Sequence, residues 1–562
     1  MRKWVWLTVS VGLLLLVGLA SVVSLRWHAA RTPPIFEVEL DGAATKPVSG
    51  RLLLFATEAN AARRAAKGGR VERVDADPLY PMRAAVAARE VSRLAPGQKV
   101  VIDTDGLAFP MSFSKLPPGE YLLQAVLDPD HNYNYSGRGA GDLISPVISV
   151  RLPAITPSTL RLVRVQSEPY PWQLTSSAEL RAAAPDARAH TQRLDFISPV
   201  LSAFWGRPTH VRGWVLLPPD YAANAKTQFP TVYYTHGYGG GEDRLLSAVV
   251  GVDMAMANGE MPPMIWVFLD ESAPTGTHEF ADSVNNGPWG RALTGELIPQ
   301  LEMHYRMDAR ASGRFLTGHS SGGWATLWLQ VMYPKLFGGT WSTSPDPVDF
   351  HDFSGIDLYA PKAQVYRRPD GSFWPLERIN GEIEGTFEDS AKLERVIGPY
   401  GGQMSSYEWV FSPRSDDGRP ALLFDRDTGL VDPEVAAYWR DHYDIAHYIQ
   451  THWPVLKPLL DGKIHVLVGT ADTYYLDGAV HRLQAVLDGL HARSDFRYLA
   501  GKNHEDLYIE GDDPRALLKR ISWAMYAVAR PHSPLLKGSP EQAMPASEAR
   551  VHAPGADRSA AR

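Results

Sequence analysis

The sequence predicts an α/β fold, with a mostly parallel sheet covered by helices on both faces, preceded by a β-sandwich-like N-terminal domain. Two observations predict the α/β part: from about residue 200 short apolar strands alternate with segments of helical periodicity, and glycines follow several strands. One observation predicts the β-rich domain: residues 31–165 hold several strand-length apolar runs separated by Gly and Pro. A chain of 562 residues is too long for one compact core, which agrees with at least two domains.

The N-terminus predicts export from the cytoplasm. Arg2 and Lys3 precede an uncharged, apolar run over residues 4–25. This run is long enough to span a bilayer as an anchor, whereas the small residue Ala20 suits cleavage of a signal peptide. Both alternatives for residues 1–30 place the rest of the chain outside the cytoplasm. We therefore expect a periplasmic or secreted protein, or one anchored to the inner membrane by this segment.

The α/β domain is expected over residues 166–530. Its predicted strands cover 210–218, 229–237, 263–270, 314–320, 337–344, 464–472 and 496–504, and its clearest helices cover 290–306, 323–333 and 514–530.

A segment over residues 345–455 interrupts this alternation and predicts a lid-like insertion, because an insertion at the carboxyl edge of such a sheet lies over the substrate crevice. Its aromatic residues either line that crevice or form a core of the lid itself. The tail over 531–562 is rich in Ala, Pro, Ser and charged residues, which predicts disorder.

Composition excludes several classes of function. The chain has no cysteine, which rules out disulfides, thiolate catalysis and cysteine metal sites. A net charge of -7 provides no basic surface for nucleic acid. Alternating oxygen-bearing residues from Asp128 to Asn134 resemble a calcium loop, but the glycine and the bidentate acid of an EF-hand are replaced by Tyr133 and Gly139, which favours a polar hairpin loop. No metal or cofactor is expected.

The strongest motif is G-x-S-x-G at residues 318–322. A strand precedes it and a helix follows it, as required for a serine placed on a sharp turn between the two elements. The N–H groups at the start of that helix favour negative charge beside the serine. Ser320 is therefore the predicted nucleophile, and the context predicts an α/β-hydrolase fold.

A serine hydroxyl needs a neighbouring base, and in this fold the acid and the histidine follow the serine along the chain. His504 directly follows the last predicted strand and is the predicted base. The acid should follow the preceding strand, which ends in Asp472; this residue is the preferred acid, and Asp477 is the alternative.

The predicted oxyanion hole combines two backbone N–H groups. One belongs to Ser321, the residue after the nucleophile. The other belongs to the glycine-rich loop after the strand at 229–237, where Tyr238 is favoured over Gly237.

These residues resemble the esterase family that includes esterase D, enterochelin esterases, feruloyl esterases and mycobacterial mycolyltransferases. The resemblance rests on short motifs at residues 235–237, 285–289, 296–299, 318–323, 469–472 and 503–504. It implies an α/β-hydrolase in which Ser320, Asp472 and His504 form a catalytic triad. Two features depart from the family: Ser321 stands where methionine is common, and the long insertion is not part of the family core.

The leading hypothesis is an exported serine esterase that hydrolyses a small-molecule or glycan-linked carboxylic ester through an acyl-enzyme. One alternative is a cell-envelope acyltransferase that uses the same triad. The other is a non-catalytic binding protein on a hydrolase scaffold. The presence of a serine, an aspartate and a histidine at all three triad positions argues against this alternative. Neither the oligomeric state nor the ester is indicated by the sequence.

Overall fold

The computed structural model describes residues 35–537, except residues 43, 78–79, 154–156, 168–171, 174–176 and 224. The predicted signal or anchor at 1–30 and the tail beyond residue 537 lie outside the described residues. Within the described ranges, no helix has both the length and the apolar character needed to cross a membrane.

The chain divides into two compact units. The first comprises residues 1–75, 84–127 and 143–164, and the second comprises 76–83, 128–142 and 165–562. Two loops of the predicted N-terminal domain, 76–83 and 128–142, thus cluster with the second unit.

The first unit is built from two β-sheets that share one core. One sheet has the strand order β4-β1-β9; the other has the order β10-β7-β6-β2-β3-β5, with β8 paired to β6. Phe36 of β1, Leu54 of β2 and Leu123 of β6 are fully buried in a single apolar cluster. The elements are β1 (Phe36–Leu40), β2 (Val48–Glu58), α2 (Ala59–Ala65), β3 (Ala85–Leu94), β4 (Lys99–Ile102), β5 (Ala108–Phe109), β6 (Gly119–Asp128), β7 (Leu143–Ile144), β8 (Ile148–Leu152), β9 (Ser158–Leu162) and β10 (Arg164–Val165).

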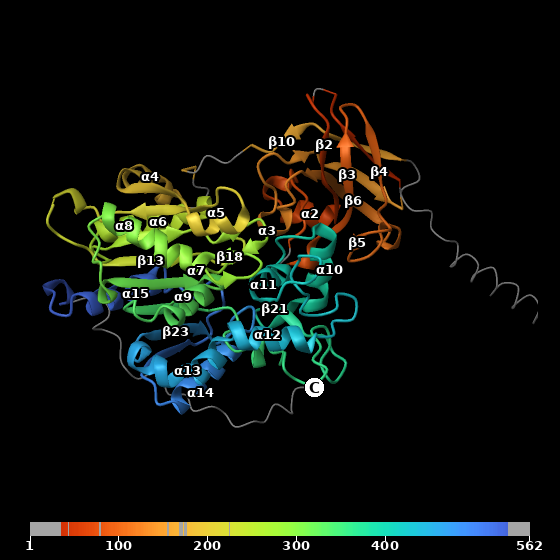
Figure 1. Cartoon of the computed structure of the whole chain (residues 1–562). Helices are drawn as coiled ribbons and strands as arrows, with labels where there is room; N and C mark the ends of the chain where they lie inside the picture. Colours follow the sequence, from red (N-terminus) through yellow and green to blue (C-terminus); the bar gives the residue numbers. More distant parts are fainter. Residues whose placement is uncertain are drawn as a thin grey trace, which may run out of the picture. The chain divides into compact units, whose positions relative to one another are not determined.

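The second unit has an eight-stranded sheet in the order β11-β12-β14-β13-β19-β20-β23-β24 (Figure 1). Strand β12 is antiparallel to both of its neighbours, and the remaining strands from β14 to β24 are parallel. This arrangement confirms the predicted α/β-hydrolase fold. The strands are β11 (Thr191–Ile197), β12 (His210–Leu216), β13 (Thr231–Thr235), β14 (Ile265–Leu269), β19 (Arg314–His319), β20 (Gly339–Thr343), β23 (Ile464–Gly469) and β24 (Ser494–Leu499).

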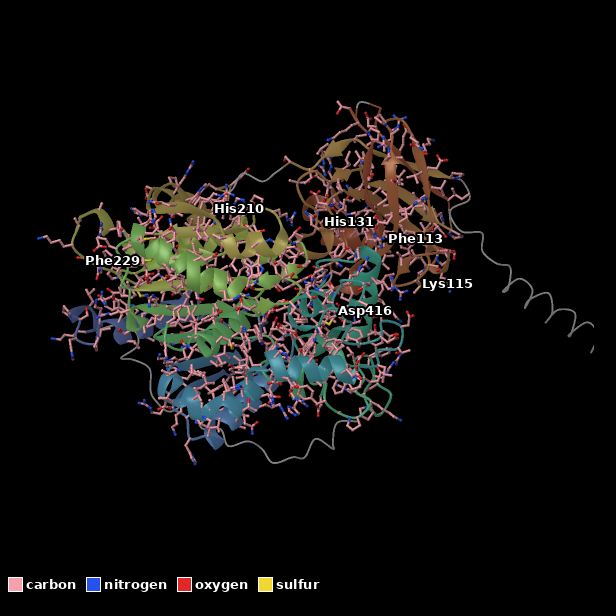
Figure 2. All side chains as sticks on the ribbon, viewed as in Figure 1. Phe113, Lys115, His131, His210, Phe229 and Asp416 are labelled. Atoms are coloured by element: carbon pink, nitrogen blue, oxygen red, sulfur yellow. The ribbon has the colours of Figure 1, made fainter. Side chains whose placement is uncertain are left out.

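Helices cover both faces of this sheet because its strands are apolar on both sides. In β14, Trp266 and Phe268 pack with α4 (Ala178–His190), α6 (Glu242–Ala257) and α15 (Ala516–Ala529). Ile265 and Val267 of the same strand belong to the opposite cluster, with α5 (Pro199–Trp205) and α8 (Ile298–His304). Figure 2 shows the side chains that fill these layers, with the buried Phe229 labelled in the second cluster.

The predicted helix at 290–306 is formed by three consecutive segments: α7 (Trp289–Arg291), a π-helical stretch over 292–297, and α8. The helix that follows the G-x-S-x-G turn is α9 (Ser321–Met332).

The segment between β20 and β23 adds its own elements to the sheet. They are β21 (Pro375–Ile379), β22 (Glu382–Thr386), α10 (Phe387–Ile397), α11 (Gln403–Phe411), α12 (Pro433–Tyr443) and α13 (Ile445–Leu460). Helix α13 contacts α9 and α14 (Asp477–Gly489), so it is the crossover that parallel strands β20 and β23 require. The predicted insertion end at 455 therefore lies inside this crossover helix, and the added elements end at about α12.

Most of the aromatic residues in this segment form a core. Phe411 and Trp439 are buried together and pack against Trp324 of α9. Tyr407 differs, because it also lines the cavity described below. Both alternatives drawn from the sequence therefore apply, to different residues of the segment.

Candidate active site

Ser320 lies on a strained turn between β19 and α9. Its backbone has φ 61° and ψ -128°, a region that non-glycine residues rarely occupy. A Cβ at Gly318 would lie 2.3 Å from the carbonyl oxygen of Gly322, and one at Gly322 would lie 2.3 Å from that of His236. Only glycine fits on either side of Ser320, which explains the spacing of the motif.

His504 and Asp472 are joined by a hydrogen bond across two neighbouring loops. Asp472 follows β23 and His504 follows β24, and these strands are parallel neighbours. The distance from His504 Nδ1 to Asp472 Oδ2 is 2.9 Å. Asp472 Oδ1 accepts from the N–H of Tyr474 at 3.0 Å, which fixes the orientation of the carboxylate. Asp472 is fully buried and His504 nearly so.

Burial and charge act against each other on this pair. Burial alone would lower the pKa of His504, but the charge of Asp472 and its hydrogen bond outweigh burial and raise the pKa above the ordinary 6.5. Burial would raise the pKa of Asp472, yet the charge and hydrogen bond of His504 bring that pKa below its ordinary value. The pair thus favours an ionised Asp472 beside His504.

Asp477, the alternative acid, is engaged elsewhere. It begins α14, and its Oδ1 lies 3.5 Å from Nη2 of Arg378. The structure therefore joins Asp472, and not Asp477, to His504.

The loops that carry Asp472 and His504 touch through Gly469. A Cβ at this position would lie 2.1 Å from the carbonyl oxygen of Lys502, which also accepts the N–H of Ala471 at 3.0 Å. We expect Gly469→Ala to push the loops apart and to lower the free energy of unfolding by about 1–3 kcal/mol, as overpacking does. Urea denaturation measures this change.

Gly489→Ala is the matched control, because no atom lies within 4 Å of a Cβ at the end of α14. Its stability should equal or slightly exceed that of the native protein. Equal stability of the two variants would show that the approach of the two loops is not tight.

The hydroxyl of Ser320 hydrogen-bonds to a carboxylate that the sequence did not single out. Its Oγ lies 3.4 Å from Oδ1 of Asp346, in the loop after β20. The other oxygen, Oδ2, accepts from Ser321 Oγ at 2.7 Å and from Tyr407 OH at 2.8 Å. Among the described residues, no hydrogen bond joins Ser320 to His504. Burial raises the pKa of Asp346, and the three hydroxyl donors oppose that rise.

The loop after β13 lies directly against Ser320. A Cβ at Gly237 would lie 2.8 Å from the Cβ of Ser320. The hydroxyl of the next residue, Tyr238, lies 2.7 Å from the carbonyl oxygen of Gly401 and 3.0 Å from that of Asn134. This tyrosine therefore ties the loop to the added segment and to the 128–142 loop. Ser321 is the first residue of α9, where backbone N–H groups lack helical acceptors.

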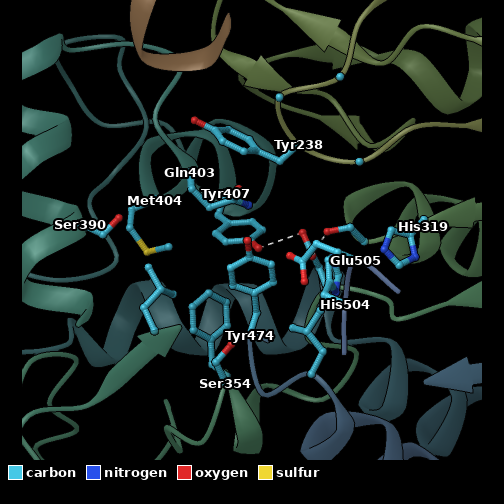
Figure 3. A pocket seen from close by; sticks show the side chains of 18 of the residues that line it. Tyr238, His319, Ser354, Ser390, Gln403, Met404, Tyr407, Tyr474, His504 and Glu505 are labelled. Atoms are coloured by element: carbon cyan, nitrogen blue, oxygen red, sulfur yellow. Dashed lines mark hydrogen bonds between the residues drawn. The ribbon is translucent and has the colours of Figure 1, made fainter. Parts of the chain in front are cut away.

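A cavity of about 580 Å³ opens onto these groups. Ser320, His504 and Asp346 line it on one side, and the rest of the wall is largely apolar. In Figure 3, Tyr407 and Tyr474 project between Met404 and His504. The apolar wall comes from Phe353, Leu376, Phe387, Met404, Tyr407 and Leu476.

Two other histidines near Ser320, His236 and His319, contact residues other than Ser320. His236 is held by Asp270, with Nε2 and Oδ1 2.9 Å apart. Burial lowers the pKa of His319 to about 3, so this ring stays neutral beside His504, with ring centroids 4.3 Å apart.

One cluster in the described part of the chain has the arrangement of a metal site: Asp349, His351 and Asp444 offer ligand atoms within 4.8 Å of one another. Asp349 already pairs with His351 at 2.8 Å, and Asp444 Oδ2 accepts from Phe350 N and from Tyr359 OH. These internal contacts account for the cluster as part of the fold.

The side-chain oxygens of the loop that begins at Asp128 likewise form hydrogen bonds within the fold. Its two carboxylate oxygens accept from the N–H groups of Asp130 and Tyr133, at 3.0 and 2.9 Å. The amide of Asn134 donates to the carbonyl oxygens of Glu394 and Gly398. The loop therefore uses these side chains to hold α3 (Tyr133–Ser136) against α10.

The sequence analysis did not identify Asp346 as a neighbour of Ser320, nor Tyr407 as the donor of a hydrogen bond to Asp346. A signal for Asp346 existed, because it closely follows a parallel strand at the edge that carries Ser320. Tyr407 lies 61 residues further along the chain, and its contact depends on the fold of the added segment.

Comparison with known proteins shows similarity to esterases. Residues 202–393 match the model of the family described as "Putative esterase". Esterase MT1326 and Esterase Rv1288, both from Mycobacterium tuberculosis, are 30% identical over 220 residues, 36% of this chain and 46% of each relative. The chain thus spans about half the length of the curated relatives that it matches.

A solved ferulic acid esterase is 14% identical, with a TM-score of 0.37 over 60% of this chain and 97% of that one. The family model ends before Asp472 and His504 but includes Ser320. Residues 202–393, the segment that includes Ser320, therefore resemble this esterase family.

Proposed function

We propose that the protein is a serine esterase that hydrolyses carboxylic esters through an acyl-enzyme. The observation that carries this proposal is the bond from His504 Nδ1 to Asp472 Oδ2, 2.9 Å long, in a cavity that also exposes Ser320 on its strained turn. The names of the curated relatives, both esterases, support the same class of reaction.

In the proposed first step, Ser320 Oγ attacks the ester carbonyl while His504 Nε2 takes the hydroxyl proton. The serine leaves its long hydrogen bond to Asp346 in this step. The backbone N–H groups of Ser321 and Tyr238 stabilise the developing oxyanion, with Gly237 allowing the close approach of the loop. His504 then protonates the leaving alcohol, and Asp472 keeps its ring in the correct tautomer.

The cavity favours an ester with an apolar group. Its wall of Phe353, Phe387 and Met404 suits an apolar acyl chain or ring, and Asp346 and Glu505 disfavour a carboxylate there. We also propose that the added elements from β21 to α12 act as the lid of this cavity, and that the N-terminal sheets form a β-sandwich. Export through residues 1–30 remains part of the proposal, based on the charged and apolar pattern alone.

The pH dependence of kcat/KM tests the proposed function. His504 must be neutral to accept a proton, so activity falls as the pH decreases through its pKa. Because Asp472 raises that pKa, the midpoint of the acid limb should lie above 6.5. We expect hydrolysis of p-nitrophenyl acetate with this profile between about pH 5 and 9. No hydrolysis, or a rate that is constant across the range, would contradict the proposal.

A further inference from the structure

The carboxylate of Asp346 has two oxygens in different situations. Oδ2 is held by Ser321 Oγ and Tyr407 OH at 2.7 and 2.8 Å. Among the described residues, Oδ1 is in contact with Ser320 Oγ alone, at 3.4 Å, longer than a usual hydrogen bond between oxygens. Asp346 is 4% exposed and lines the cavity. Oδ1 is therefore a buried, weakly occupied acceptor beside the nucleophile.

Acylation removes even this weak donor. Once Ser320 carries an acyl group, its Oγ has no proton to donate to Asp346. A buried charged acceptor without a donor is costly, so a new donor at Oδ1 stabilises the acyl-enzyme complex. The molecule that next approaches Ser320 is the one that attacks the acyl carbonyl.

We propose that Asp346 Oδ1 forms the binding site for the water molecule that hydrolyses the acyl-enzyme. This inference rests on the proposed function. Water has two hydrogens: one points to Nε2 of His504, and the other to Oδ1 of Asp346. A simple alcohol has one O–H, which the histidine needs, and it leaves Oδ1 without a donor. The site therefore favours hydrolysis over transfer to simple alcohols.

The water oxygen forms a bond to the acyl carbon while one proton moves to His504 Nε2. The bond between that carbon and Ser320 Oγ then breaks, and the proton on His504 passes to Oγ. The carboxylic acid leaves with the second water hydrogen, the one that Asp346 held. Tyr407 and Ser321 position Asp346 by fixing its other oxygen.

The partition of the acyl-enzyme between water and methanol tests this site. In Asp346→Asn, the amide oxygen can accept from Ser321 and Tyr407, so the NH₂ group faces the cavity and turns the acceptor into a donor. With p-nitrophenyl butyrate in buffer containing methanol, we expect hydrolysis of the acyl-enzyme to slow by about 10- to 100-fold, the loss of one hydrogen bond to a charged group. Methanolysis should slow less, so the ratio of methyl ester to acid should rise about tenfold.

The control is Ser390→Ala, which removes another polar side chain that lines the same cavity, from α10, and should leave the ratio unchanged. Labelling by a fluorophosphonate shows whether Asp346→Asn is folded. If it is not, Tyr407→Phe frees the carboxylate to rotate, and the ratio should shift in the same direction by about twofold to fivefold.

An unchanged ratio in a folded, labelled variant would overturn the water site. Equal slowing of acylation and deacylation, measured by stopped flow, would also overturn it, because Asp346 would then only orient Ser320. Absence of labelling and of a burst in the native protein would instead reject the proposed function itself.

Discussion

Ser320→Ala should lower kcat by about 10⁴- to 10⁶-fold, as loss of the nucleophile does in other triads. The reason is geometric as well as chemical. Ser320 lines the cavity on a turn whose glycines at 318 and 322 leave no room for a Cβ, whereas the neighbouring Ser321 is fully buried and its hydroxyl is bonded to Asp346. Initial rates with a p-nitrophenyl ester at saturating concentration measure the effect.

Ser390→Ala is the matched control, because this serine also lines the cavity but lies on α10. It should retain activity close to that of the native protein. If Ser320→Ala kept more than about a tenth of the native kcat, the assignment of the nucleophile would be wrong.

Asp472→Asn should lower kcat by about 10³- to 10⁴-fold, with little change in KM. The asparagine can offer an NH₂ group to His504 Nδ1, which favours the tautomer with its proton on Nε2. That nitrogen could then no longer accept the serine proton. The pKa of His504 should also decrease, since the carboxylate charge raises it, and the acid limb of the pH profile should move to lower pH.

The control for the acid is Asp477→Asn. This carboxyl has a pKa raised to about 6 by burial, and its ion-pair partner is Arg378 rather than His504. Activity within a few-fold of native is expected. The reverse order, with Asp477→Asn more damaging than Asp472→Asn, would identify Asp477 as the acid.

The order of the site residues along the chain was predictable because it follows from the order of the strands. Local patterns are enough to recognise a serine between a strand and a helix. They are also enough to recognise an acid and a histidine that follow the last two strands. The choice between Asp472 and Asp477 was not local. Both follow β23, and only the contact with the loop after β24 distinguishes them.

The parts that the sequence did not predict depend on contacts between distant segments. Strand β3, with the sequence AVAAREVSRL, has residues that suit a helix, and its pairing with β2 overrides that preference. Nothing in the residue type of Asp346 distinguishes it from other aspartates. Its role emerges only when Tyr407 of the added segment folds back over the sheet and binds it.

The most direct measurement is mass spectrometry of the intact protein and its peptides after reaction with a fluorophosphonate. A hydrolase with the proposed nucleophile should gain one adduct, located on Ser320, and lose esterase activity in proportion to labelling. Ser320→Ala should gain none. An adduct on another residue, or full esterase activity without any adduct, would contradict the assignment of Ser320 as the nucleophile.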